Sequence, residues 1–140
     1  MLVLNDFGAT LASMDAVRSM TDVTGFGLLG HLTELCEGSN LSAHIRYAQV
    51  PKLDVLDYYL QEKTFPGGTT RNFNSYGHHI APLTDEQRNV LCDPQTSGGL
   101  LVAVDPSGRE AFLEAATAHG LSLSSFGTMV PREHHLITVF

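Results

Sequence analysis

The sequence predicts an α+β fold in which α-helices pack against a mixed β-sheet. One part of the chain has apolar residues at helical spacing, on the face formed by Leu28, Leu32, Leu35 and Cys36. Residues 41–47 instead alternate between apolar and polar, which is typical of a half-buried strand. The two patterns mix along 140 residues, a length that suits one domain. Helix–strand alternation by itself would equally permit a parallel α/β sheet.

The first half of the chain predicts three helices and one strand. A helical stripe over residues 5–19 comes from Phe7, Leu11, Met14 and Val17. The helix after residue 27 has Thr24 as its expected N-cap and Gly38 as the left-handed residue beyond its end. After the strand at 41–47, Pro51 opens a helix to about Glu62. Its expected inward residues are Leu53, Leu56, Tyr59 and Leu60.

The second half begins with the longest irregular stretch, residues 64–82, a length that is usually functional or mobile. Thr84 and Gln87 then form a capping box for a short helix to about Leu91. The continuous apolar run 100–104 predicts a strand covered on both faces. A helix from Asp105 and Pro106 to about His119 ends at Gly120. Two strands, over roughly 121–130 and 134–139, complete the chain.

Composition excludes several classes of protein. Fifteen Asp and Glu stand against eight Lys and Arg, so the basic footprint of a nucleic-acid-binding protein is missing. No apolar run approaches the ~18 residues of a membrane span, and we read no signal peptide at the start. Cys36 and Cys92 are far apart, which favours a reduced, cytoplasmic setting with buried structural thiols.

The segment 21–32 is the most informative part of the chain. Asp22 lies between Thr21 and Thr24, shortly before a helix N-terminus, and could ligate Mg²⁺ through its carboxylate. Gly25 and Gly27 would let backbone N–H groups approach a phosphate. The alternative is that Asp22 only caps the helix or the turn. One carboxylate is not a complete magnesium site, and no second acid lies at an obvious companion position.

Two further glycine-bearing segments have the same ambiguity. The segment 93–99 contains turn-forming side chains followed by a glycine pair, namely Asp93, Gln95, Thr96, Ser97, Gly98 and Gly99. It is either a tight structural junction or a ligand-facing loop, and it lacks the lysine of a Walker A motif. The segment 66–72 offers an anion cradle with a cation, or a simple turn, built from Gly67, Gly68, Thr69, Arg71 and Asn72. The seven histidines lack zinc-type spacing and are read as structural or surface residues; His31 alone lies on the helix that carries the first segment.

Together, these three segments resemble those of the selenophosphate synthetases, in the same order and spacing, from about Leu4 onward. The resemblance is to the C-terminal domain of that family, within the aminoimidazole ribonucleotide synthetase superfamily, and it favours the mixed sheet. It implies an enzyme that converts selenide, ATP and water to selenophosphate, AMP and phosphate with Mg²⁺. It further implies that Asp22 is a magnesium ligand, that the glycine-rich loops lie at an active site or domain junction, and that the protein is a homodimer.

The same resemblance implies that an N-terminal ATP-binding and catalytic domain is absent from this chain. In the family, that domain holds the catalytic Cys or selenocysteine, the essential Lys and the other metal-binding acids. Cys36 and Cys92 lie in the wrong places to replace it, so this chain has no expected catalytic residue and is expected to be inactive by itself. The alternatives are a non-catalytic binding or dimerisation module and a domain of another ATP-dependent enzyme of the superfamily.

Overall fold

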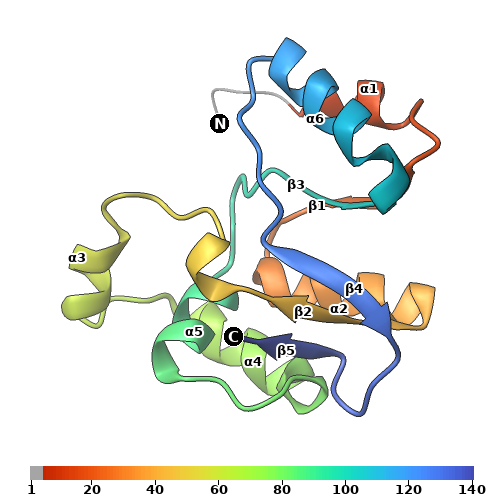
Figure 1. Cartoon of the computed structure of the whole chain (residues 1–140). Helices are drawn as coiled ribbons and strands as arrows, with labels where there is room; N and C mark the ends of the chain where they lie inside the picture. Colours follow the sequence, from red (N-terminus) through yellow and green to blue (C-terminus); the bar gives the residue numbers. More distant parts are fainter. Residues whose placement is uncertain (1–4) are drawn as a thin grey trace.

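Two separate β-sheets organise the chain, and each has its own helices (Figure 1). The computed structural model describes residues 5–140. Its strands are β1 (Val17–Asp22), β2 (Leu41–Ile45), β3 (Leu100–Val104), β4 (Gly127–Pro131) and β5 (Ile137–Val139). β1 pairs with β3 in an antiparallel ribbon, while β2 lies between antiparallel β4 and parallel β5. The expected α+β class with a mixed sheet is confirmed.

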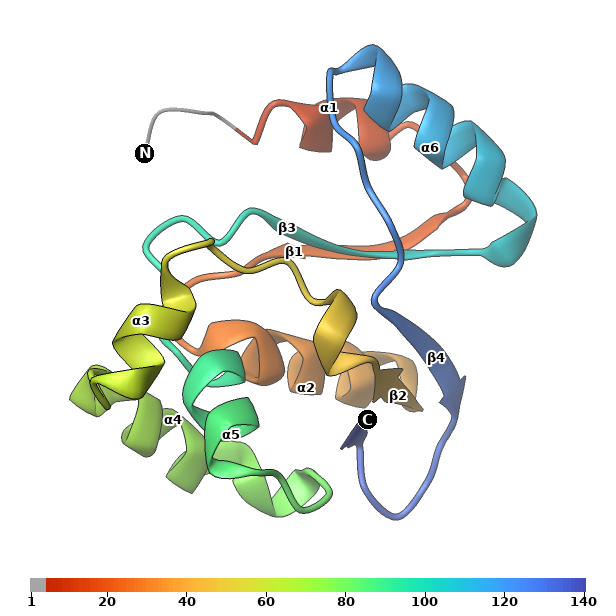
Figure 2. The same cartoon turned by 60° about the vertical axis from the view of Figure 1, so that its left-hand side comes forward.

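One helix connects the two sheets. The helices are α1 (Phe7–Leu11), α2 (Gly27–Ser39), α3 (Leu56–Gln61), α4 (Gly67–Tyr76), α5 (Asp85–Leu91) and α6 (Arg109–Ala118), with single turns η1 (Tyr47–Gln49), η2 (Gly77–His79) and η3 (Pro106–Gly108). α2 contacts β1 and β3 of the ribbon, β2 and β5 of the sheet, and both α4 and α5. α1 and α6 lie on the opposite side of the ribbon from α2 (Figure 2).

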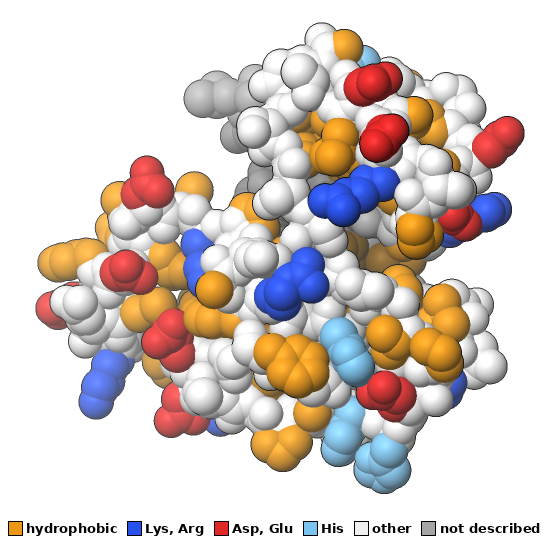
Figure 3. Space-filling view, in the orientation of Figure 1, with side chains coloured by type: hydrophobic (Ala, Val, Ile, Leu, Met, Phe, Trp, Pro, Cys, Tyr) orange, Lys and Arg blue, Asp and Glu red, His pale blue; other side chains and the backbone are white. Residues whose placement is uncertain are grey.

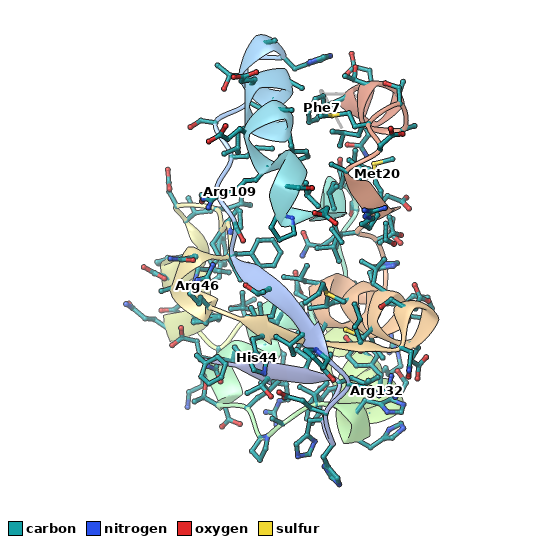
Figure 4. The ribbon with its side chains drawn as sticks, turned by 45° about the vertical axis from the view of Figure 1, so that its right-hand side comes forward. Phe7, Met20, His44, Arg46, Arg109 and Arg132 are labelled. Atoms are coloured by element: carbon teal, nitrogen blue, oxygen red, sulfur yellow. The ribbon has the colours of Figure 1, made fainter. Side chains whose placement is uncertain are left out.

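The ribbon separates two apolar cores, which explains the uninterrupted apolar sequence of β3. Leu101 faces the larger core, which is built around Leu29 of α2. Leu100 and Val102 pack on the smaller core around Phe7, and Met20 of β1 joins it there (Figure 4). Successive residues of a strand point to opposite faces, so an apolar run serves both cores. The strand predicted at 100–104 is confirmed with a core on each face, although Leu101 is buried and the other four residues are half-buried.

The prediction of a helix over residues 5–19 is wrong beyond Leu11, where α1 ends. Val17–Asp22 is a strand, because its backbone pairs with β3, about eighty residues further along the chain. Thr24 does not cap α2, since Phe26 occupies the N-cap position without a side-chain bond. The helix also runs past Gly38, and Asn40 takes the left-handed conformation at φ 55°.

The irregular stretch expected over 64–82 is also wrong, because α4 occupies most of it. Thr69, Asn72 and Tyr76 are its buried residues and lie on one helical face. The helix expected from Pro51 is confined to α3, and Leu53 and Tyr59 point outward with 79% and 49% exposure. The last two strands are shorter than expected. Figure 3 shows the segment around α3 projecting from the body with apolar side chains on its surface.

Other local predictions are confirmed. The capping box at α5 has both of its bonds, from Gln87 N to Thr84 Oγ1 at 3.1 Å and from Thr84 N to Gln87 Oε1 at 2.9 Å. Asp105 caps η3, and Gly120 is left-handed at φ 74°, just past α6.

Among residues 5–140, no helix combines the length and the apolarity needed to cross a bilayer.

The capping box gives a stability prediction. Thr84→Ala removes a side-chain acceptor from the first turn of α5 and should lower the free energy of unfolding by about 1 kcal/mol in urea denaturation. Thr70→Ala is the matched control, because Thr70 is exposed on α4 and its side chain bonds no described residue. It should change stability by less than about 0.5 kcal/mol. Equal effects of the two substitutions would contradict the assigned cap.

Candidate functional site

The three glycine-bearing segments meet at the end of the β1–β3 ribbon (Figure 2). Val23 N donates to Gly99 O at 2.9 Å, and Gly98 N donates to Val23 O at 3.1 Å. Gln95 N donates to Thr24 O at 3.0 Å. These bonds extend the pairing of the ribbon beyond Asp22 and join the first segment to the third. We call residues 22–27, 66–72 and 92–99 together the junction.

Asn72 joins the second segment to the other two. Its Nδ2 donates to Gly25 O at 2.8 Å and to Cys92 O at 2.9 Å. The side chain is 9% exposed, and its amide supplies both hydrogens to carbonyls of other segments. One turn further along α4, Tyr76 Oη donates to Phe26 O at 2.6 Å. This third bond depends on α4, which places Tyr76 on the same helical face as Asn72, whereas the sequence predicts an irregular stretch here.

Close contact between segments explains two of the junction glycines. Gly27 has φ +71°, and a Cβ there would lie 2.7 Å from the carbonyl carbon of Cys92. A Cβ on Gly68 would lie 2.6 Å from Cγ of Pro94. Both distances are below any normal contact, so a side chain at either position would push two segments apart. The glycines are therefore required by packing between segments of the chain itself.

Asp93 is a half-buried acid with internal partners. Thr69 Oγ1 donates to its carboxylate at 3.4 Å, and Gln95 Nε2 donates at 3.0 Å. Burial raises the pKa of Asp93, and the two hydrogen bonds offset part of that rise. Because its pKa is raised, ionisation of Asp93 destabilises the folded state relative to the unfolded state. This destabilisation disappears when the pH falls below the ordinary pKa of an aspartate, since Asp93 is then protonated in both states. Thr69, Asp93 and Gln95 hold the junction together, whereas Thr96 and Ser97 are exposed.

Asp22 differs from Asp93 in having a free carboxylate. It is the last residue of β1, is exposed, and makes no side-chain hydrogen bond or ion pair with any residue in 5–140. It does not cap α2, whose N-cap is Phe26. Thr21, its neighbour, lines a groove of about 530 Å³ between β1 and α2, so the two side chains lie on opposite faces of the strand.

The carboxylate of Asp22 fits one ligand position of a magnesium ion, whose ligands are oxygens. It does not form a complete site. Within the part of the chain that the structure describes, no group of three or more His, Cys, Asp or Glu is placed to hold a metal. Thr24 and Gly27 already use their backbone N–H groups internally, on His31 and on Thr24 O respectively. Among the residues expected to face phosphate, Gly25 is the exposed one.

The two cysteines are buried and reduced, as expected. Burial raises the pKa of the Cys36 thiol to about 11 and also raises the pKa of Cys92. Because the thiolate is the reactive form, neither side chain is an activated nucleophile. The cations are dispersed over several elements, as Arg46, Arg109 and Arg132 illustrate in Figure 4. Arg71 is the arginine that lies within the junction, with its guanidinium near Gly67 and Gly68.

Comparison with known proteins assigns the family. The family described as AIR synthase related protein, C-terminal domain, matches residues 4–139. The chain belongs to this family. This chain is also 56% identical to the Selenide, water dikinase of Pseudomonas putida over 139 residues. The resemblance to the C-terminal domain of selenophosphate synthetases is thereby confirmed.

Two further relatives of this chain are also named Selenide, water dikinase. The Selenide, water dikinases of Pseudomonas aeruginosa and Sulfurimonas denitrificans are 52% and 50% identical over 139 residues. Each match covers 99% of this chain and 40% of the relative. The chain therefore spans less than half of the length of these relatives.

Asn72 provides the sharpest test of the junction. In Asn72→Asp the carboxylate cannot donate to Gly25 O and Cys92 O, and it lies against two carbonyl oxygens. The variant should lose on the order of 3 kcal/mol of stability at neutral pH in urea denaturation. The deficit should shrink as the pH falls, because the protonated acid can donate one hydrogen bond.

Asn74→Asp is the matched control, since Asn74 is exposed on the same helix. It should remain within about 0.5 kcal/mol of the wild type. Wild-type stability of Asn72→Asp would show that the two carbonyls do not depend on this amide.

Proposed function

We propose that this chain is the C-terminal domain of a selenide, water dikinase, which makes selenophosphate from selenide, ATP and water and releases AMP and phosphate. The supporting observation is 50–56% identity, over 139 residues, to proteins of that name. The junction adds support from this chain, because the three segments that carry the resemblance come together in space. They lie beside a free carboxylate rather than in unrelated loops.

In this proposal Asp22 is one magnesium ligand. Its carboxylate is exposed, while the two residues after it are held by backbone hydrogen bonds to the third segment. The remaining oxygen ligands come from ATP phosphates, water and carboxylates of an N-terminal domain. When bound, Mg²⁺ would neutralise the charge that develops on the phosphate oxygens.

The other residues of the junction have separate proposed tasks. Gly25 leaves backbone accessible next to Asp22, and Thr21 is placed toward the groove against α2. Thr24 and Gly27 shape the turn through bonds within the chain. Thr69, Asn72, Asp93 and Gln95 fix the second and third segments. None of these residues needs to change its covalent state during the reaction.

We infer that the principal partner of this domain is its own N-terminal domain, with ATP and selenide bound in the two-domain protein. The relatives are more than twice as long as this chain. Phe26, next to Gly25, is 54% exposed, which leaves apolar surface beside the turn for contact with that domain. On the family resemblance, we further propose that the two-domain protein is a homodimer in the cytoplasm. The buried free thiols suit a reducing compartment.

The isolated chain should make no selenophosphate, because it supplies one carboxylate for phosphate charges that need several metal-bound oxygens. Phosphorus NMR of the folded chain with ATP, Mg²⁺ and selenide under anaerobic reductant is the measurement. Addition of the N-terminal half in trans should produce the selenophosphate resonance. Product from the isolated chain would contradict the proposed division between the domains.

Asp22→Asn in the two-domain protein tests the proposed ligand. Loss of a metal-bound carboxylate should cost about 3 kcal/mol of transition-state stabilisation, or roughly 100-fold in rate at fixed Mg²⁺. The free energy of unfolding should change little, because the exposed side chain makes no hydrogen bond or ion pair with residues 5–140. Asp54→Asn, at an exposed site near α3, is the control and should leave the rate unchanged. Full activity of Asp22→Asn with the wild-type Mg²⁺ dependence would exclude Asp22 as a ligand.

A further inference from the structure

His31 is a buried histidine that bonds to the turn carrying Asp22. It lies on α2, is 6% exposed, and its Nε2 accepts from Thr24 N at 3.0 Å. Thr24 Oγ1 lies 3.1 Å from the same nitrogen. The ring of Phe26 meets the imidazole edge-on, with ring centroids 5.8 Å apart. The imidazole is thus enclosed by residues of the first glycine-bearing segment.

The bond from Thr24 determines the tautomer of His31. A backbone N–H can only donate, so Nε2 must present its lone pair. The proton of the neutral ring is therefore on Nδ1. That nitrogen is buried, has no aligned hydrogen bond, and lies 3.3 Å from Oε2 of Glu34 along α2. The Glu34 carboxylate lies closer to Nδ1 than a charge–charge contact requires, so its negative charge favours a proton on that nitrogen.

His31 completes the restraint on the residues that follow Asp22. Thr24 O accepts hydrogen bonds from Gln95 N and Gly27 N. Val23 N donates to Gly99 O, and Val23 O accepts from Gly98 N. The Thr24 N–H is the remaining backbone group of this pair, and His31 is its partner. With that bond, both residues after Asp22 have their backbone polar groups satisfied. Without it, the turn loses its connection to the side of α2.

We propose that His31, in the Nδ1–H tautomer favoured by Glu34, is a positioning residue that fixes the backbone turn after Asp22 and so the place from which the Asp22 carboxylate projects. The inference rests on the proposed function, because it assigns His31 to the site in which Asp22 binds Mg²⁺. His31 itself touches neither metal nor substrate. Its role is comparable to an outer partner that orients a metal ligand through the intervening backbone.

The first experiment addresses the tautomer and does not depend on activity. Histidine-labelled chain is studied by ¹⁵N NMR at alkaline pH, with His31→Gln used to assign the His31 signals among the seven histidines. The expected result is a protonated Nδ1 and an unprotonated Nε2 with a fixed, unaveraged pair of shifts. Glu34→Gln should weaken that preference. A protonated Nε2, or averaging between tautomers in the wild type, would overturn the proposal.

The second experiment measures the Mg²⁺ dependence of selenophosphate formation in the two-domain protein. His31→Leu should raise the Mg²⁺ concentration for half-maximal rate about tenfold, with little change at saturating Mg²⁺. His31→Gln retains an acceptor and should stay within about threefold of the wild type. His134→Gln, at an exposed position, is the control.

The outcomes separate the inference from the proposed function. If the wild type and the control respond to Mg²⁺ while His31→Leu has the wild-type Mg²⁺ dependence, the positioning role is wrong and the proposed function stands. If His31→Gln and His31→Leu lose rate equally at all Mg²⁺ concentrations, His31 acts only through stability and the inference fails. If the wild type forms no selenophosphate, the proposed function fails and the link to Asp22 fails with it, whatever tautomer NMR shows.

Discussion

Backbone hydrogen bonding between Val23–Thr24 and the segment 95–99 is the constraint on which the rest of this structure depends. The β1–β3 pairing ends at Asp22 and Leu100, and three further bonds carry the connection into the loops on either side. One of these loops leads into α2 and the other comes from α5. The relative position of the two helices, and the larger core between them, therefore follows from how this short stretch of backbone pairs.

The polar side chains of the junction stabilise the same arrangement of loops. Asn72 brings α4 to this stretch by donating to one carbonyl of each loop, and Tyr76 adds a third bond. A buried carbonyl without a donor destabilises a fold by about 1–3 kcal/mol, so these side chains are required once the glycines have allowed close approach. Burial raises the pKa of Asp93, and its carboxylate accepts hydrogen bonds from within the chain. The carboxylate of Asp22, in contrast, has no hydrogen-bond or ion-pair partner among residues 5–140.

Much of the fold was predictable where local signals decide the structure. The capping box at Thr84 and Gln87, the apolar face of α2 and the left-handed Gly120 each depend on neighbours in sequence. β1 was missed because its partner β3 lies far along the chain, and long-range pairing overrides a weak helical spacing. α4 was missed because Pro66, Gly67 and Gly68 suggest a loop. Its stability comes from the tertiary contacts of Thr69, Asn72 and Tyr76. In the candidate site, the sequence motif identified Asp22, whereas the contacts of His31 and Asn72 required the fold.

Residues 23–24 and 95–99 form a hydrogen-bonded frame beside the exposed carboxylate of Asp22. Amide hydrogen exchange of this chain, followed residue by residue, tests that claim most directly. The amides of Val23, Gln95 and Gly98 donate to backbone oxygens of the frame, and that of Thr24 donates to His31 Nε2 on α2. All four should therefore exchange as slowly as the amides in the middle of α2. Exchange as fast as that of the exposed amides around α3 would show that the frame opens freely and would contradict this account.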